Sequence, residues 1–149
     1  MNKPFKTYSA VFPLILKKEG EITKILLHRR QNTGYMDGKL DVAGSGHVDE
    51  GETATAALVR ECREELGIEV DFADVAFAHL SHRFAPDRTY YDIYFVVKKY
   101  GKTPVIMERE KCLELAWVDI SKLPDDVIPC RARVIEEFKG KSFYSEIIE

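Results

Sequence analysis

Three closely spaced glutamates are the residues of this chain best suited to hold a metal ion. Glu61, Glu64 and Glu65 lie within residues 53–66, whose Ala, Leu, Glu and Arg content predicts a helix. Spacings of three and four residues bring their carboxylates onto one side of that helix, where each like-charge pair costs about 0.2–0.5 kcal/mol. A divalent cation would offset this repulsion, and converging carboxylate oxygens suit Mg²⁺ or Mn²⁺. Acidic runs also occur as plain solvated faces, so the three glutamates alone leave both interpretations open.

The same predicted helix carries an apolar side next to the glutamates. Leu58, Val59, Cys62 and Leu66 cluster on it at about 100° per residue and are expected to pack on a sheet. Gly67 follows as a residue that commonly ends helices. The carboxylates are therefore expected at the border between core and solvent.

The residues around the glutamates complete a longer pattern. The chain has Gly46, five residues, Glu52, seven residues, Arg60-Glu61-Cys62, one residue, Glu64-Glu65, one residue, and Gly67-Ile68. This pattern resembles the box of the Nudix hydrolases, G-x5-E-x7-R-E-U-x-E-E-x-G-U, where U is a bulky aliphatic residue. The one departure is Cys62 at the first U position, a small apolar replacement on the core-facing side. By this resemblance the chain is identified as a member of that family.

The resemblance implies roles for the box residues. Glu61 and Glu65, with Glu64 as a third ligand, are expected to bind Mg²⁺ or Mn²⁺. Glu52 and Arg60 are expected to pair and to hold the loop before the helix in place. Gly46 is expected to let that loop approach the metal and substrate through its backbone. The residue before it is Ser45, where family members usually have glycine.

The activity that the resemblance implies is hydrolysis of the phosphoanhydride of a nucleoside diphosphate linked to another group. Bound divalent cations would neutralise charge on the phosphates and acidify a water molecule, and a carboxylate would take the proton. The base is left open among Glu61 and the later glutamates Glu108, Glu110 and Glu114, of which Glu110 is favoured.

A basic residue near the end of the preceding strand reaches the substrate phosphates in similar proteins. Arg29 and Arg30 both fit this description. Alternation along a strand places them on opposite faces, so one of the two is expected to bind phosphate. Asp119 lies in a region where some relatives read the nucleobase with a carboxylate.

Among substrates, a nucleoside triphosphate of the pool-sanitising type is favoured, and a nucleotide sugar or ADP-ribose is the alternative. Two further hypotheses assign the chain to a functional class other than hydrolase. A non-catalytic nucleotide-sensing module usually loses box glutamates, whereas all four are present here. An isopentenyl-diphosphate isomerase-like enzyme relies on a cysteine upstream of the box, where this chain has none.

The elements that must position these residues form a mixed pattern. Apolar and β-branched runs predict strands over 8–17, 22–30, 40–43, 68–80, 90–99 and 113–118, and a closing helix over 129–138. Because strands and helices do not alternate regularly, we expect one α/β (α+β) domain over residues 1–149 with a mixed sheet. The resemblance implies the α/β/α sandwich of the Nudix type.

Composition excludes several other classes of protein. The chain has 149 residues, 45% of them hydrophobic and 32% charged, and a net charge of −3. This excludes a disordered chain, and the lack of basic excess indicates no nucleic-acid partner. The apolar run 9–16 is too short to cross a membrane and lacks a cleavage site, so no membrane partner is expected. Three widely spaced cysteines fit free thiols in the cytoplasm, and homodimer formation is left open.

Overall fold

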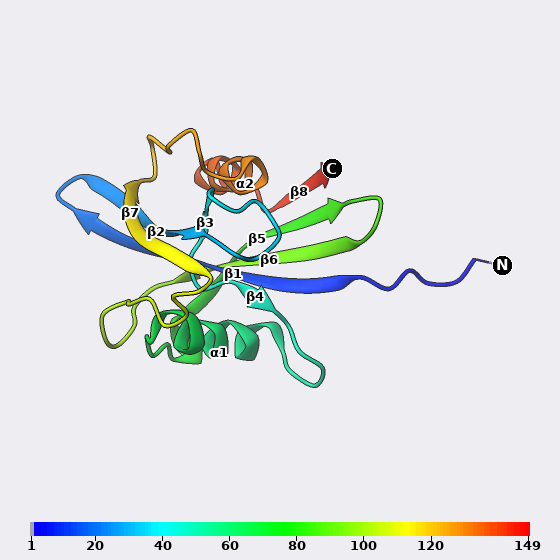
Figure 1. The fold of residues 1–149 in the computed structure, drawn as a ribbon, viewed down its shortest axis with the longest axis horizontal. Helices are drawn as coiled ribbons and strands as arrows, with labels where there is room; N and C mark the ends of the chain where they lie inside the picture. Colours follow the sequence, from blue (N-terminus) through cyan, green and yellow to red (C-terminus); the bar gives the residue numbers. More distant parts are fainter. Residues whose placement is uncertain (1) are drawn as a thin grey trace.

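A computed structural model describes residues 2–149. Strand β1 (Tyr8–Glu19) runs through the centre of the sheet, and β6 (Thr89–Val97) lies parallel to it. Strand β5 (Val75–Phe84) pairs antiparallel with β6, and β8 (Tyr144–Ile148) pairs in parallel with β5 at the sheet edge. These strands form the long layer that crosses the centre of Figure 1.

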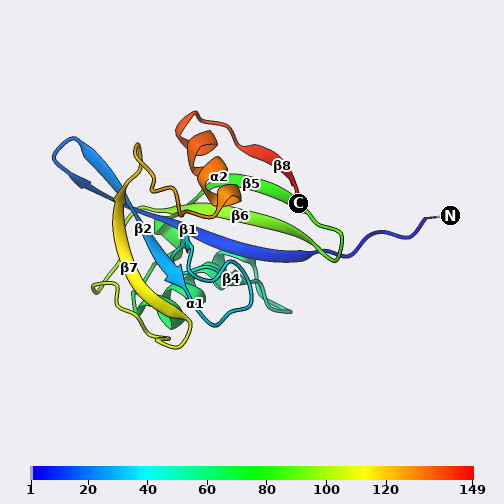
Figure 2. The same ribbon diagram turned by 45° about the horizontal axis from the view of Figure 1, so that its top comes forward.

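A second group of strands surrounds β2 (Ile22–Arg30). It pairs antiparallel with β3 (Leu40–Val42) on one side and with β7 (Cys112–Asp119) on the other. Strand β1 pairs with β2 only over residues 16–19, next to their connecting turn. Nearer its beginning, β1 pairs instead with the short β4 (Gly46–His47). The two groups of strands therefore diverge away from the turn, as Figure 2 shows.

One helix covers each face of this sheet (Figure 1). On one face lies α1 (Ala54–Leu66), which begins after Thr53, whose hydroxyl accepts a hydrogen bond from the N–H of Ala56 at 3.2 Å. It ends at Gly67, whose φ of 66° glycine adopts without steric cost. On the opposite face lies α2 (Pro129–Lys139), with proline in its first turn.

Two apolar clusters hold the layers together. Under α1, Leu58, Cys62 and Leu66 are fully or almost fully buried against the sheet, as their helical spacing predicts. Under α2, Val134 and Ile135 are buried in the second cluster. This mixed sheet with two covering helices confirms the predicted fold class. No helix within residues 2–149 is both long and apolar enough to cross a membrane.

The predicted strand over 68–80 is wrong in its extent. Within it, Asp74 donates a backbone hydrogen bond to the carbonyl of Asp71 at 2.9 Å and closes the 3₁₀ helix η1 (Phe72–Asp74). The strand therefore starts only at Val75 and runs past the predicted end, to Phe84. Strands β4 and β8 were not predicted, because two and five residues carry too little periodicity to be recognised.

Candidate active site

Arg60 ties the loop that precedes α1 to the helix. Its Nε and Nη2 donate to the two carboxylate oxygens of Glu52 at 2.9 and 2.7 Å, and Nη2 also donates to the carbonyl of His47 at 3.0 Å. The bonds from Arg60 to Glu52, together with a bond that the N–H of Asp49 donates to Glu52, lower the pKa of Glu52 to about 2. The expected pairing of Glu52 and Arg60 is confirmed, and it anchors residues 46–52 on α1.

Gly46 and Glu61 are in direct contact across this loop. A β-carbon on residue 46 would overlap the carboxylate of Glu61, so this approach requires glycine. Glu61 is buried, and burial raises its pKa although Arg60 Nη1 donates to it at 2.8 Å. The carboxylate is thus held in a tight, partly desolvated position.

A second carboxylate of α1 shares this environment. Burial, together with the charges of Glu108 and Glu61, raises the pKa of Glu65 to about 7. Glu108 comes from the loop before β7, which is fastened to α1 by the N–H of Met107 donating to the carbonyl of Glu65 at 3.2 Å. Negative charge from two separate segments therefore gathers at one place.

This donor set fits a hard divalent cation. Glutamate oxygens are preferred ligands of Mg²⁺ and Mn²⁺, and a cation would offset the burial and the repulsion that raise both pKa values. In the part of the chain that the structure describes, no three His, Cys, Asp or Glu side chains are already arranged to hold an ion. Instead, Arg60 Nη1 bonds both Glu61 and the more exposed Glu64, at 2.8 and 3.1 Å. A bound ion would compete with Arg60 for these two carboxylates.

A cavity of about 910 Å³ lies next to the glutamates. Its size suits a small-molecule ligand of nucleotide dimensions. Gly46 and Glu65 form part of its wall, so an ion held by the glutamates would face the cavity. Ala10 of β1 and His28 of β2 also line it, which indicates that it fills the space between the diverging strands. Further lining comes from Ser45, His47, Tyr35, Tyr90, Arg88 and Lys111.

Only one of the two candidate phosphate-binding arginines lines the cavity. Arg30 does so, and its Nη1 donates to Asp41 at 2.9 Å. Arg29 projects elsewhere, where its Nε and Nη1 donate to Glu114 and Asp126, each at 2.7 Å. The predicted separation of the two arginines onto opposite faces is confirmed.

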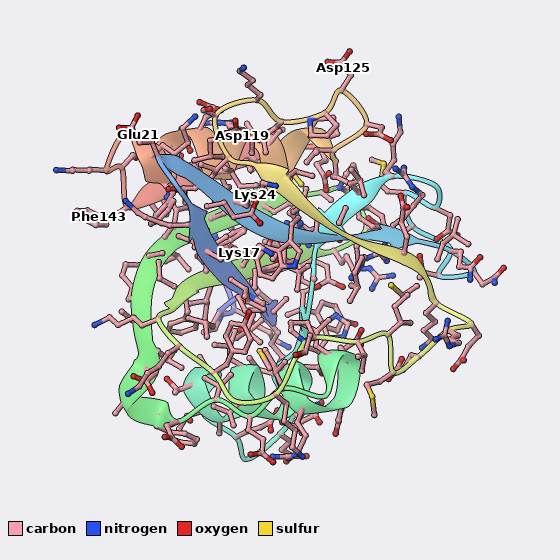
Figure 3. All side chains as sticks on the ribbon, turned by 90° about the vertical axis from the view of Figure 1, so that its left-hand side faces the viewer. Lys17, Glu21, Lys24, Asp119, Asp125 and Phe143 are labelled. Atoms are coloured by element: carbon pink, nitrogen blue, oxygen red, sulfur yellow. The ribbon has the colours of Figure 1, made fainter. Side chains whose placement is uncertain are left out.

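The later glutamates and Asp119 differ in their bonding partners and in how near they lie to Glu65. Glu114 is bound to Arg29, and the carbonyl of Glu110 accepts a hydrogen bond from Asn32 Nδ2 at 2.9 Å. None of the three later glutamates lines the cavity, but Glu108 is close enough to raise the pKa of Glu65. Asp119 lies opposite Lys24 in the pairing of β7 with β2, near the β1–β2 turn (Figure 3 labels both residues), and also lies outside the cavity wall.

A continuous chain of ion pairs runs along one side of the cavity, and all of its members except Asp92 line it. Arg131 Nε donates to Asp41 at 2.9 Å, and its Nη1 donates to Asp92 at 3.1 Å. Arg83 Nε donates to the same Asp92 oxygen at 2.8 Å. The chain alternates in charge and runs through Arg30, Asp41, Arg131, Asp92, Arg83 and Glu149. Burial opposes ionisation of Asp41, but Arg131, His28 and Arg30 hold its pKa below its usual value.

This chain of ion pairs was not predicted from the sequence, although a signal was present. Arg131 stands three and four residues before Val134 and Ile135, on the apolar side of α2. Asp92 alternates with Tyr90 and Tyr94 on β6, where an inward-facing carboxylate interrupts aromatic residues. A charged residue at a core-facing position is rarely placed there without a partner.

Comparisons with known proteins agree with this arrangement. A family model described as NUDIX domain matches residues 6–138. The chain is 30% identical over 119 residues to 8-oxo-dGTP diphosphatase of Escherichia coli (strain K12), covering 80% of this chain and 88% of that protein. It is 29% identical over 110 residues to Nudix hydrolase 5 of Arabidopsis thaliana, covering 72% of this chain but 35% of the plant protein. Its fold is similar to that of a MutT NUDIX hydrolase from Burkholderia pseudomallei, with a TM-score of 0.76, 20% identity, and coverage of 89% and 98% of the two chains.

Proposed function

Because this chain belongs to the Nudix family of hydrolases, we propose that it is a Mg²⁺- or Mn²⁺-dependent pyrophosphohydrolase of nucleoside triphosphates. One observation carries this proposal: Gly46 and Glu65 form part of the wall of a nucleotide-sized cavity, and Glu61 packs on Gly46. The bound phosphates would then lie beside the carboxylates, and the rest of the nucleotide would extend along the cavity.

In this proposal Glu61 and Glu65, with Glu64 as a third ligand, hold the divalent cation. When bound, such an ion neutralises charge on the phosphoanhydride and lowers the pKa of a coordinated water. Arg60 keeps the glutamates and the loop from Gly46 to Glu52 in register through its bonds to Glu52 and His47. It acts as a positioning residue.

Glu108 is the later-loop glutamate that we propose as general base, in place of Glu110. Its charge reaches Glu61 and Glu65, and the preceding residue, Met107, is hydrogen-bonded to α1. A carboxylate on that anchored loop can accept a proton from an attacking water next to the ion. Glu110 has no comparable support.

Arg30 is the residue that we propose to bind a substrate phosphate. Its guanidinium lines the cavity and is oriented by Asp41, the hydroxyl of Thr33 and the carbonyl of Tyr35, at 2.9, 2.9 and 2.7 Å. A guanidinium fixed in this way is pre-organised for phosphate oxygens. Arg29 is already engaged by two carboxylates outside the cavity.

The nucleoside triphosphate assignment has support from the E. coli relative, whose name states that it acts on 8-oxo-dGTP. The cavity also accommodates a nucleotide sugar or ADP-ribose, which are the alternative substrates. All three cysteines are free and buried, and we propose that the protein works in the cytoplasm, where thiols stay reduced.

The test is a metal-dependent hydrolysis screen of purified protein against nucleoside triphosphates, nucleotide sugars and ADP-ribose. We expect phosphate or pyrophosphate release from at least one nucleoside triphosphate with Mg²⁺ or Mn²⁺, and none in EDTA. Hydrolysis confined to nucleotide sugars or ADP-ribose would contradict the nucleoside triphosphate assignment and favour the alternative substrates. Absence of any metal-dependent hydrolysis would contradict the proposal as a whole.

A further inference from the structure

Arg131 is a buried cation with one part of its guanidinium left unused. The residue is 3% exposed, and it stacks over Phe12 with 4.0 Å between the guanidinium carbon and the ring centre. Its Nε donates to Asp41, and its Nη1 donates to Asp92 and to the hydroxyl of Tyr94 at 3.0 Å. Nε and Nη1 are therefore fixed by the protein.

The remaining nitrogen, Nη2, makes no hydrogen bond to any residue between 2 and 149. It is not among the described side-chain atoms that are both sealed from solvent and unpaired, and Arg131 lines the cavity. Its two N–H groups are thus presented to the cavity. Arginine has five such donors, and these two remain available to a ligand.

The charge around Arg131 decides what kind of group these donors suit. Asp41 and Asp92 flank it, and the whole chain of ion pairs contains three arginines and three carboxylates. Asp41 and Asp92 therefore balance the charge of Arg131 itself and would repel a further anionic group next to Nη2. A neutral acceptor needs only the two N–H groups.

Aromatic surface adjoins the same donors. Phe12 and Tyr90 line the cavity, and Tyr90 is covered on one side by Arg83 at 4.3 Å from its ring centre. The ring of Phe12 is already covered by Arg131 and stacked with Tyr94, so these rings offer edges rather than open faces to a planar heterocycle. The wall thus combines aromatic edges with a fixed pair of donors.

We propose that Arg131 determines base specificity, by donating from Nη2 to a carbonyl oxygen of the nucleobase. The inference rests on the proposed function, since it takes the ligand to be a nucleotide. An exocyclic amino group at that position would set donor against donor and leave Nη2 unpaired. The enzyme therefore prefers bases with an oxo group, such as hypoxanthine and uracil, over their amino counterparts, adenine and cytosine.

Substrate-side changes test this without altering the protein. Wild-type kcat/KM is measured with Mg²⁺ for ITP, ATP and purine riboside triphosphate, and for UTP against CTP. We expect ITP and UTP to exceed their counterparts at least about tenfold, because a site built around a hydrogen bond rejects analogues that lack it. Equal rates for ITP and ATP would overturn the inference and leave the proposed function intact. No hydrolysis of any nucleotide would instead overturn the proposed function, and the inference with it.

A variant tests whether Arg131 causes the preference for bases with an oxo group. Arg131→Lys keeps the charge but cannot hold Asp41 and Asp92 while also presenting the Nη2 pair. It should bring the ITP-to-ATP ratio close to unity. Arg133→Lys is the matched control, since that arginine lies on the same helix, is half exposed and bonds only Glu146 and Glu137. It should keep the wild-type ratio. A wild-type ratio in Arg131→Lys would overturn the inference.

A measurement on the wild type covers the case in which Arg131→Lys does not fold. The guanidinium resonances of Arg131 are followed by NMR during titration with inosine monophosphate and with purine riboside monophosphate. We expect them to shift with the first nucleotide and to shift much less with the second. Resonances that shift with neither nucleotide, or equally with both, would overturn the proposed role of Arg131 in base specificity.

Discussion

The carboxylate of Glu61 occupies the space that a β-carbon on Gly46 would need. This contact joins the loop before α1 to the helix itself, and it explains why glycine stands at the start of the box. The loop is held there independently by Arg60, which bonds Glu52 and the carbonyl of His47. Loop and carboxylate thus define each other's position at the cavity wall.

Gly46→Ala should separate activity from stability. The three atoms nearest to the new methyl group all belong to the flexible end of Glu61, so that side chain can move aside and the melting temperature should change little. The displaced carboxylate should lower metal affinity or turnover about 10–100-fold, as changes that misorient a ligand do. Gly101→Ala is the control, because its β-carbon would meet Glu69 only at an ordinary 3.8 Å. Full turnover in Gly46→Ala would contradict the importance of the contact.

The two loop glutamates should differ in their effect on catalysis. Glu108→Gln removes the proposed base and should lower kcat about 10²–10⁴-fold with little change in KM. Glu110→Gln should leave kcat near the wild-type value, because neither the cavity lining nor the charges acting on Glu61 and Glu65 include Glu110. Steady-state kinetics on both variants show which glutamate is the general base, and the reverse pattern would identify Glu110 as that base.

Arg30 and Arg29 provide a second matched pair. Arg30→Gln should raise KM for the nucleotide, because that guanidinium lines the cavity, and part of the loss should remain at saturating metal. Arg29→Gln removes the ion pairs to Glu114 and Asp126 and should leave KM unchanged. If Arg29→Gln alone raised KM, the choice between the two strand residues would be wrong.

The raised pKa of Glu65 predicts a pH-dependent stability of the metal-free protein. Since its folded-state pKa is about 7, against an ordinary 4.5, the folded protein binds this proton more tightly than the unfolded chain. Stability should therefore fall as the pH rises from about 4.5 to 7, and the full penalty should be present above 7. After allowance for solvent screening the penalty is about 1–2 kcal/mol.

Glu65→Gln removes this penalty. Thermal unfolding in EDTA should show the variant to be more stable than the wild type at pH 8, and the difference should disappear near pH 4. Adding Mg²⁺ at pH 8 should stabilise the wild type much more than the variant. A difference that stays the same at both pH values would mean that Glu65 ionises freely in the folded protein.

The features that could be predicted from the sequence are those determined by the spacing of residues close together in the chain. The helix of the box, its buried Leu58 and Leu66, the pairing of Glu52 with Arg60, and the opposite faces of Arg29 and Arg30 all follow from periodicities of 3.6 and 2 or from the family pattern. Each of these relationships lies within one element or between neighbouring ones.

What could not be predicted depends on segments far apart in the chain. The chain of ion pairs beside the cavity joins Asp41 of β3, Asp92 of β6 and Arg131 of α2, and no local pattern indicates that these residues meet. The preference for Glu108 over Glu110 depends on how the loop before β7 is fastened to α1, through the bond from Met107 to Glu65. Such relationships arise only when the tertiary structure forms.

The most direct test is Mn²⁺ binding to the purified protein without nucleotide, followed by electron paramagnetic resonance. Wild-type protein should bind the ion, Glu65→Gln should bind it at least about tenfold more weakly, and Glu69→Gln, which alters an exposed carboxylate paired with Lys102, should match the wild type. Equal affinity in wild type and Glu65→Gln, or no binding by either, would contradict the central claim that these glutamates form a metal site facing the cavity.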